Sequence, residues 1–205
     1  MRKEYVWTDE AAIDDFLNRQ EVGHLTTIDE EGWPQTVPVN YLWQAGGIFF
    51  HSGLRGKMEH LRRNPKVAFV VTEALGLLTS EITANPCNDT QLGRSVLIRG
   101  LAREIRSQEE KLKALHKIVA KYDPRGLADE PGSRPRDPEI LANEPAFNGC
   151  SVVTIEVVKM TARQQLLGGK PDKYRKTVAA HFQKIGQESG RERDLKTALL
   201  LNESL

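Results

Sequence analysis

The residues best suited to chemistry lie in one short stretch of the chain, residues 47–65. Within it, Ile48–Ser52 has the β-branched and aromatic residues typical of a strand, and Gly53 and Gly56 follow. Lys57 then opens a short basic helix, where free N–H groups and the helix dipole attract an anion. The pattern predicts a phosphate-binding turn. A plain strand-to-helix turn with a solvated lysine fits the same local residues.

Length and composition indicate a globular protein. The chain has 205 residues, 39% of them apolar and 28% charged, which allows one domain with a core, or a domain plus an appendage. The net charge of +1 gives no electrostatic reason to expect nucleic acid or an anionic membrane as a partner. No apolar run reaches the roughly 18 residues that span a bilayer. The N-terminal residues 1–7 also lack the apolar core of a signal peptide.

The two cysteines, Cys87 and Cys150, fit no zinc-binding spacing, so we expect no metal site. Free thiols in a reducing compartment are the simplest interpretation, and we therefore expect a cytoplasmic protein.

The first half of the chain predicts a small antiparallel sheet. A helix is expected over residues 8–20, where apolar residues recur at helical spacing. Strands are expected at residues 24–28, 35–43 and 48–52, separated by short polar turns. Such short connections predict that the three strands form an antiparallel meander.

The second half alternates strands, helices and loops. The expected elements are a basic helix at 56–64 in which Arg62 and Arg63 face solvent, a buried strand at 66–72, a short strand at 77–82, a long strand at 94–105 with a bulge at Gly100, a helix capped by Ser107, and a last strand at 151–160. Residues 123–145, rich in proline and glycine, predict a surface loop or lid. Residues 173–205 are amphipathic in places and predict a helical tail.

In this order the elements resemble the pyridoxamine 5'-phosphate oxidase-like family of FMN-binding split barrels. The matching pieces are Leu25–Pro34, Thr36–Tyr41, Ile48–Ser52 with Lys57, Leu61 and Asn64-Pro65, and Arg94–Ala102. His51 at the end of the third strand and the run Arg94–Val96 are most similar to the branch that contains nitroimidazole-resistance reductases.

The resemblance implies a mainly β fold with flanking helices, an antiparallel, Greek-key-like split β-barrel. The matching pieces cover roughly residues 8–160, and the composition changes beyond Leu167-Gly168-Gly169. We therefore expect residues 1–167 to form the FMN-binding domain and residues 168–205 a helical C-terminal extension. The cofactor would be FMN, and the partner a second copy of the chain, in a homodimer with two FMN sites at the subunit interface.

The resemblance also assigns residues to the FMN site. The backbone along the isoalloxazine ring would be that of Val37, Pro38, Val39 and Asn40. The ribityl phosphate would be surrounded by Phe50, His51, Ser52 and Lys57, with Arg55 as a further cation and Ser95 reaching the flavin from the partner subunit. His51 is also the candidate for catalytic proton transfer, because imidazole titrates near neutral pH. The alternative for His51 is a hydrogen-bond partner for the phosphate or the backbone.

The leading function is that of an FMN-dependent oxidoreductase that passes electrons from a reduced donor to a small acceptor, such as a nitro compound or a quinone. Val37 and Gly56 stand where family members with full oxidase activity carry arginine. The arginine–x–histidine motif and the tryptophan that close the oxidase substrate site are also missing, which argues against vitamin B6 synthesis. Two alternatives stay open: a non-catalytic flavin- or haem-binding module, with His24, His51 or His60 as iron ligand, and a structural dimer with an empty site.

Overall fold

The computed structural model describes residues 3–53, 56–123 and 149–204. The strands are β1 Val22–Ile28, β2 Pro34–Asn40, β3 Leu42–Gln44, β4 Gly47–Gly53, β5 Lys66–Leu78, β6 Thr90–Glu104 and β7 Cys150–Gln165. The α-helices are α1 Glu10–Arg19, α2 Lys57–Arg63, α3 Ser80–Thr83, α4 Gln108–Tyr122, α7 Asp172–Ser189 and α8 Glu192–Glu203, and short 3-10 turns lie at Lys3–Tyr5 and Pro86–Asn88. The expected loop at 123–145 falls, from residue 124 on, outside the described residues.

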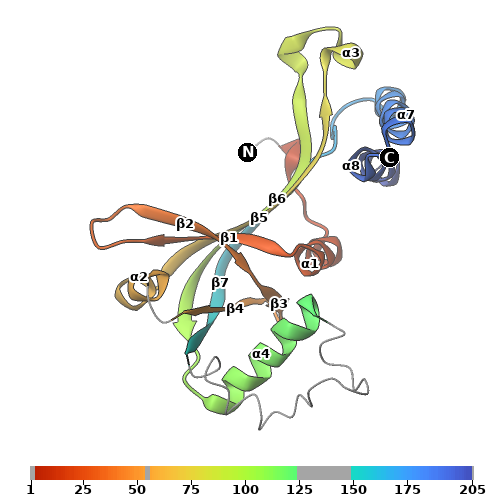
Figure 1. Ribbon diagram of the computed structural model, residues 1–205. Helices are drawn as coiled ribbons and strands as arrows, with labels where there is room; N and C mark the ends of the chain where they lie inside the picture. Colours follow the sequence, from red (N-terminus) through yellow and green to blue (C-terminus); the bar gives the residue numbers. More distant parts are fainter. Residues whose placement is uncertain (1–2, 54–55, 124–148, 205) are drawn as a thin grey trace, which may run out of the picture. The chain divides into compact units, whose positions relative to one another are not determined.

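The strands form one antiparallel sheet in the order β2-β1-β5-β6-β7-β4-β3 (Figure 1). The sheet does not close on itself, and with its flanking helices it confirms the predicted split β-barrel class. The β1–β2 hairpin pairs from Val22 opposite Asn40 to Ile28 opposite Pro34. The predicted meander forms only in part. Its two hairpins are present as β1–β2 and β3–β4, but the expected strand at 35–43 is divided, and β2 and β3 lie at opposite ends of the sheet order.

Tyr41 explains why the expected strand at 35–43 is two strands. Its side chain is fully buried, and its hydroxyl donates to the carbonyl of Leu17 at 2.6 Å. Its own N–H donates to the Tyr122 hydroxyl at 2.7 Å, and that hydroxyl donates to the Tyr41 carbonyl at 2.6 Å. A tyrosine side chain therefore satisfies the backbone of Tyr41 in place of a neighbouring strand, and the chain changes direction there.

Two further expectations are corrected. The expected strand at 77–82 does not form: β5 ends at Leu78 and α3 begins at Ser80. The expected bulge at Gly100 is absent, since burial alternates without a break from Val96 to Arg103. Instead, glycine at position 100 allows the backbones of β6 and β7 to come close together, because a Cβ there would lie 2.5 Å from the carbonyl oxygen of Glu156.

The structure divides into two compact units. Unit 1 comprises Met1–Ile13, Thr72–Val96 and Thr161–Leu205, and unit 2 comprises Asp14–Val71 and Leu97–Met160. Both units take parts of β5, β6 and β7. The domain boundary between residues 167 and 168 stays a prediction.

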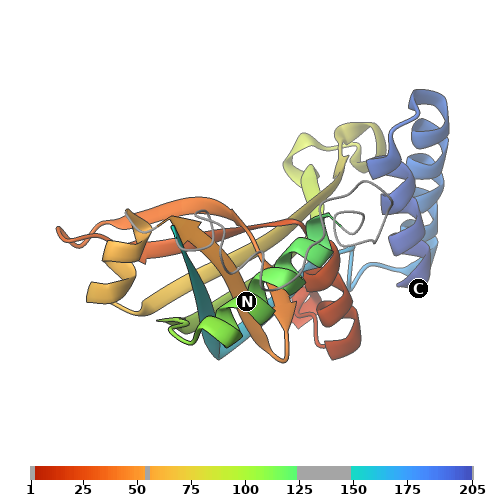
Figure 2. The same ribbon diagram turned by 60° about the horizontal axis from the view of Figure 1, so that its bottom comes forward.

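Unit 1 has its core between the helical pair and the strand ends. Helices α7 and α8 lie side by side (Figure 2), and Phe182 and Leu201 join a buried cluster with Leu75 and Leu92. The hydroxyl of Thr197 accepts a 2.8 Å hydrogen bond from the N–H of Gly76, so α8 is tied to β5 by polar as well as apolar contacts.

Unit 2 has an aromatic core and a helix across one face of the sheet. Tyr41 and Phe69 are both fully buried and meet edge to face, with ring centroids 5.1 Å apart. Helix α4 begins as predicted, with the Ser107 hydroxyl accepting from the N–H of Glu110. Its Ala114 packs with Ile105, the residue just after β6, and with Val152 of β7.

The C-terminal end of α4 carries a half-buried amine. The Nζ atom of Lys121 donates to the carbonyls of Gln20 at 2.8 Å and Tyr41 at 3.0 Å, and lies 4.2 Å from the centre of the Tyr41 ring. Burial lowers the pKa of Lys121 from 10.5 to about 8, only partly offset by the charge of Glu21. Below pH 8 the amine is charged in both the folded and the unfolded protein, and burying this charge destabilises the folded state. As the pH rises from 8 toward 10.5, the folded protein loses the proton first, and this destabilisation disappears.

We therefore expect the free energy of unfolding to increase by about 1 kcal/mol between pH 7.5 and pH 9.5, a value reduced for the half-exposed position of the amine. Urea unfolding at a series of pH values measures the rise. Lys121→Met should abolish it, whereas Lys117→Met, at an exposed position of the same helix, should retain it. An equal rise in the Lys121→Met variant would show that another group is responsible.

Candidate functional site

The predicted ring-binding segment lies on the edge strand of the sheet. Strand β2 pairs only with β1, so among the described strands its outer backbone edge is open. In this segment Val39 is buried, Val37 is half-buried, and Pro38 and Asn40 are exposed. Strand β4, which carries three of the expected phosphate-binding residues, approaches β2, with Cα atoms of the two strands within 8 Å of each other. The two strands therefore approach each other, and a site shared by their expected residues stays a prediction.

On β4 the expected residues face opposite ways. Phe50 is fully buried and Ser52 is 6% exposed, whereas His51 between them is exposed. His51 lies opposite Val152 and Ser52 opposite Ser151 in the pairing with β7. Because neighbouring strand residues point to opposite faces, the imidazole and the Ser52 hydroxyl lie on different sides of the sheet. Phe50 can meet a ligand on the His51 side only through its backbone.

Lys57 lies at the start of α2, as predicted. The residue before it, Gly56, has φ 64°, a conformation that glycine adopts without strain, and no side chain caps the helix start. Met58 and Leu61 are buried and anchor the helix, which leaves Lys57 half-buried at its first position. Arg55, the expected further cation, lies outside the described residues.

Ser95 belongs to unit 1, whereas the other predicted site residues belong to unit 2. It is half-buried on β6 and lines a hollow of about 330 Å³ together with Arg94 and Arg163. The Arg94 guanidinium stacks 4.8 Å from the centre of the Trp7 ring. The expected reach of Ser95 to a flavin of the partner subunit stays a prediction.

The three candidate iron ligands are distributed over β1, β4 and α2. His24 and His51 are exposed, and the Nδ1 atom of His60 lies 3.1 Å from the hydroxyl of the buried Thr27. Within residues 3–53, 56–123 and 149–204, no three His, Cys, Asp or Glu side chains gather as a metal ion requires.

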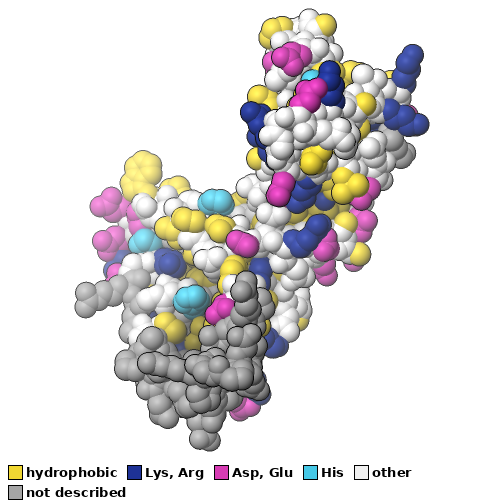
Figure 3. Space-filling model, turned by 45° about the vertical axis from the view of Figure 1, so that its right-hand side comes forward, with side chains coloured by type: hydrophobic (Ala, Val, Ile, Leu, Met, Phe, Trp, Pro, Cys, Tyr) yellow, Lys and Arg dark blue, Asp and Glu magenta, His cyan; other side chains and the backbone are white. Residues whose placement is uncertain are grey.

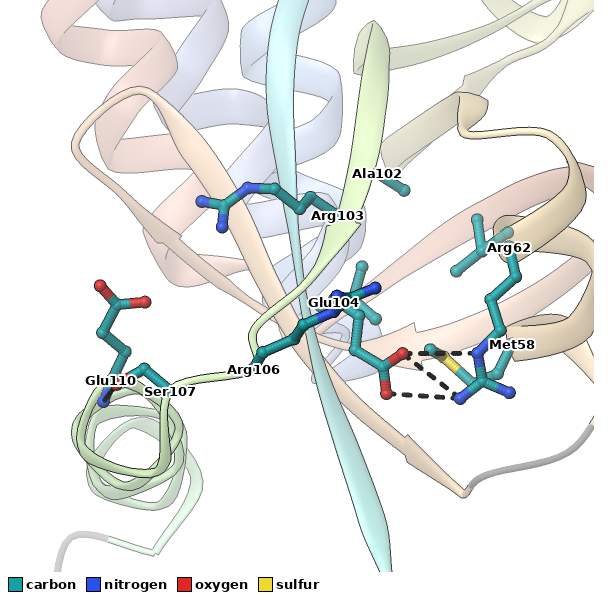
Figure 4. Close-up of a pocket in the computed structure, with 10 residues that line it drawn as sticks. Met58, Arg62, Ala102, Arg103, Glu104, Arg106, Ser107 and Glu110 are labelled. Atoms are coloured by element: carbon teal, nitrogen blue, oxygen red, sulfur yellow. Dashed lines mark hydrogen bonds and ion pairs between the residues drawn. The ribbon is translucent and has the colours of Figure 1, made fainter.

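One hollow of unit 2 lies elsewhere, and sequence reasoning missed it. It measures about 530 Å³ and is lined by Met58, Leu61, Arg62, Ala102, Arg103, Glu104, Arg106, Ser107, Glu110 and Val153 (Figure 4). None of the predicted FMN residues is among them. Arg62, which we expected to be merely solvated, is one of its walls.

Glu104 is the central acid of this hollow, which we call the arginine pocket. The Ser151 hydroxyl donates to its Oε1 atom, and Arg62 reaches the same carboxylate at 3.3–3.4 Å (Figure 4). The Ser151 hydrogen bond, followed by the contacts of Arg62 and the charge of Arg106, lowers the pKa of Glu104 despite its partial burial. The carboxylate is therefore ionised and already hydrogen-bonded by Ser151 and Arg62.

The face drawn in Figure 3 shows no broad field of one charge over the described residues. On the face visible in Figure 3, acidic and basic side chains are interspersed over the described residues. None of the helices in the described ranges combines the length and the apolar character that a bilayer crossing needs.

Comparison with solved structures relates the fold to known proteins. A proposed 5-nitroimidazole antibiotic resistance protein from Bacteroides thetaiotaomicron is 25% identical, with a TM-score of 0.60 over 77% of this chain and 85% of that one. The flavocytochrome Anf3 from Azotobacter vinelandii has a TM-score of 0.64 at 17% identity, over 78% and 69% of the two chains. An FAD and heme binding protein from Mycobacterium smegmatis has a TM-score of 0.65 at 13% identity, over 82% and 77%. The last two likenesses show the fold alone.

Comparison with curated proteins gives no match. The model of one protein family, described as pyridoxamine 5'-phosphate oxidase, matches residues 9–164. That match spans more than half of the sequence and confirms the resemblance inferred from the motifs. The chain therefore belongs to the pyridoxamine 5'-phosphate oxidase family.

Proposed function

We propose that the protein binds FMN and is an oxidoreductase, which passes electrons from a reduced donor to a small acceptor such as a nitro compound or a quinone. The observation that carries this proposal is the family match over residues 9–164, which includes every position expected to contact the flavin. The similarity to the proposed nitroimidazole resistance protein, at 25% identity, favours a nitro compound as acceptor.

The residues of the chain fit a flavin phosphate. The start of α2 offers backbone N–H groups without a side-chain cap, and a Cβ at Gly53 or Gly56 would meet nothing within 4 Å, so the backbone there is approachable. Lys57 has no ion pair within the part of the chain described. A cation beside free amides is what a dianionic phosphate requires.

The open edge of β2 fits the ring. Its backbone N–H and C=O groups over residues 37–40 can meet the polar rim of an isoalloxazine, while Val37 and Val39 supply apolar contact. When bound, FMN would supply the hydride and electron transfer, and the chain would position and polarise it. We assign His51 the transfer of a proton to or from the substrate, with hydrogen bonding to the cofactor as the alternative.

A second copy of the chain would complete the site. Leu97 and Leu101 on β6 and Val158 on the neighbouring β7 are 40%, 40% and 67% exposed, which is unusual for side chains of a sheet. An apolar face of this kind supports a homodimer in which Ser95 of each subunit reaches the flavin of the other.

A non-catalytic flavin- or haem-binding module is the second candidate. The fold is shared with a flavocytochrome and with an FAD and heme binding protein, and His24 and His51 are exposed side chains that iron can reach.

The absorbance of the purified protein separates these functions. We expect two visible flavin bands, saturable uptake of added FMN, and a dimer mass by light scattering of the FMN-loaded protein. Steady reduction of a nitroaromatic compound with NADH or NADPH would distinguish the oxidoreductase from the binding module, and a Soret band would indicate haem. Protein that takes up no FMN at high concentration would refute the proposed function.

A further inference from the structure

The C-terminal end of α4 holds the corner between β2 and β3. Tyr41 is the one residue between these two strands, and a side chain of α4 binds its backbone. The Tyr122 oxygen accepts from the N–H of Tyr41 at 2.7 Å and lies 2.6 Å from the carbonyl oxygen of the same residue. The Nζ atom of Lys121 donates to that carbonyl at 3.0 Å. Consecutive side chains of α4 therefore fix both polar groups of the Tyr41 backbone.

The same side chains reach the residues that lead into β1. The Tyr122 oxygen lies 2.7 Å from the carbonyl oxygen of Glu21, and Lys121 donates to the carbonyl of Gln20 at 2.8 Å. The Glu21 carbonyl also accepts from Nδ2 of Asn40 at 3.3 Å. Figure 1 shows the last turn of α4 close to α1 and β3. We call Lys121 and Tyr122 the corner clamp, because they tie the two open ends of the β1–β2 hairpin to each other and to the start of β3.

The corner clamp acts directly beside the backbone segment proposed for the flavin ring. Residues 37–40 are the last four of β2, and Tyr41 follows them. Among the described strands β2 pairs only with β1, so no strand supports the outer edge of this segment. The contacts at residues 40 and 41 are therefore what fixes the end of that edge in space.

We propose that Lys121 and Tyr122 are positioning residues for the flavin ring, which hold the backbone at Asn40 and Tyr41 and thereby the edge of β2 that meets the ring. The role of residues 37–40 belongs to the proposed function, on which this inference rests. Neither Lys121 nor Tyr122 is among the residues expected to contact the flavin, so both act through the backbone. Without the clamp, the edge would have to be ordered when the flavin binds, and this entropic cost would weaken binding of the ring.

Fluorescence titration of the full-length protein with FMN and with riboflavin at pH 7 tests this inference. Tyr122→Phe removes the hydroxyl and keeps the aromatic ring. We expect the dissociation constants of both flavins to rise about fivefold and by the same factor, because both carry the isoalloxazine. Lys121→Met should raise both constants about threefold. Lys57→Ala, at the proposed phosphate site, should instead weaken FMN alone.

Two variants of the same helix are the matched controls. Ser107→Ala removes the cap at the other end of α4, which destabilises the helix without touching the corner. Lys117→Met removes an exposed lysine one turn before Lys121. We expect both controls to bind FMN and riboflavin within about twofold of the wild type. Amide hydrogen exchange reports on the clamp itself, since the N–H of Tyr41 should exchange faster in Tyr122→Phe than in either control.

The outcomes separate this inference from the proposed function. If the wild type binds both flavins and Tyr122→Phe binds them equally well, the inference fails and the proposed function stands. The same holds if Ser107→Ala loses as much affinity as Tyr122→Phe, or if Tyr122→Phe weakens FMN but not riboflavin. A wild type that binds neither flavin would overturn the proposed function and the positioning role together.

Discussion

Gly100→Ala should lower the free energy of unfolding by about 2–3 kcal/mol, a large part of the 5–15 kcal/mol typical of a domain. The added Cβ would lie 2.5 Å from the carbonyl oxygen of Glu156 and 2.5 Å from Cγ2 of the fully buried Ile155. The first neighbour is backbone and cannot rotate away, so β6 and β7 must separate locally. These strands carry the edge of the arginine pocket and the apolar face proposed for the dimer.

Urea unfolding followed by tryptophan fluorescence measures this loss. Gly53→Ala is the matched control, because a Cβ there meets no atom within 4 Å and the residue does not have a positive φ. We expect the control to stay within about 0.5 kcal/mol of the wild type. If Gly100→Ala were as stable as Gly53→Ala, β6 and β7 would not approach each other at Gly100 as closely as the structure shows.

Lys57→Ala should weaken FMN binding about tenfold or more, the loss expected for one charge-assisted contact with a phosphate. The motivation is the position of Lys57 at the start of α2, where no side chain caps the helix. Lys66→Ala, an exposed lysine at the start of β5, should leave the dissociation constant unchanged.

Riboflavin makes this test specific to the phosphate. Since riboflavin has the ring but lacks the phosphate, Lys57→Ala should leave its affinity within about twofold of that of the wild type. Quenching of flavin fluorescence measures the dissociation constants of both FMN and riboflavin. If Lys57→Ala weakened riboflavin as much as FMN, Lys57 would act on the ring or on folding, and if it weakened neither, Lys57 would lie outside the site.

Local signals predicted the elements that depend on neighbouring residues. The Ser107 cap of α4, the basic helix α2 that ends before Asn64-Pro65, and the β1–β2 hairpin follow from side chains a few residues apart. The same motifs, taken in order, were sufficient to identify the family, since its pattern is a sequence of short local pieces with set gaps.

Contacts between distant residues decided the rest. Strand β4 lies beside β7 because Phe50 and Ile48 are buried there, about a hundred residues away along the chain, and no local pattern specifies that partner. The division of one expected strand at Tyr41 depends on Tyr122, and the role of Gly100 depends on Glu156.

The arginine pocket has the same origin. Arg62, Arg103 and Arg106 look like ordinary solvated charges in the sequence, and they line one hollow only because α2 packs beside the end of β6. By itself the sequence determined the family, the strand-forming segments and the candidate flavin residues, because each of these rests on local residue types. Only the tertiary structure decided the strand order, the opposite faces of His51 and Ser52, and the lining of the arginine pocket, because these follow from which distant side chains are buried together.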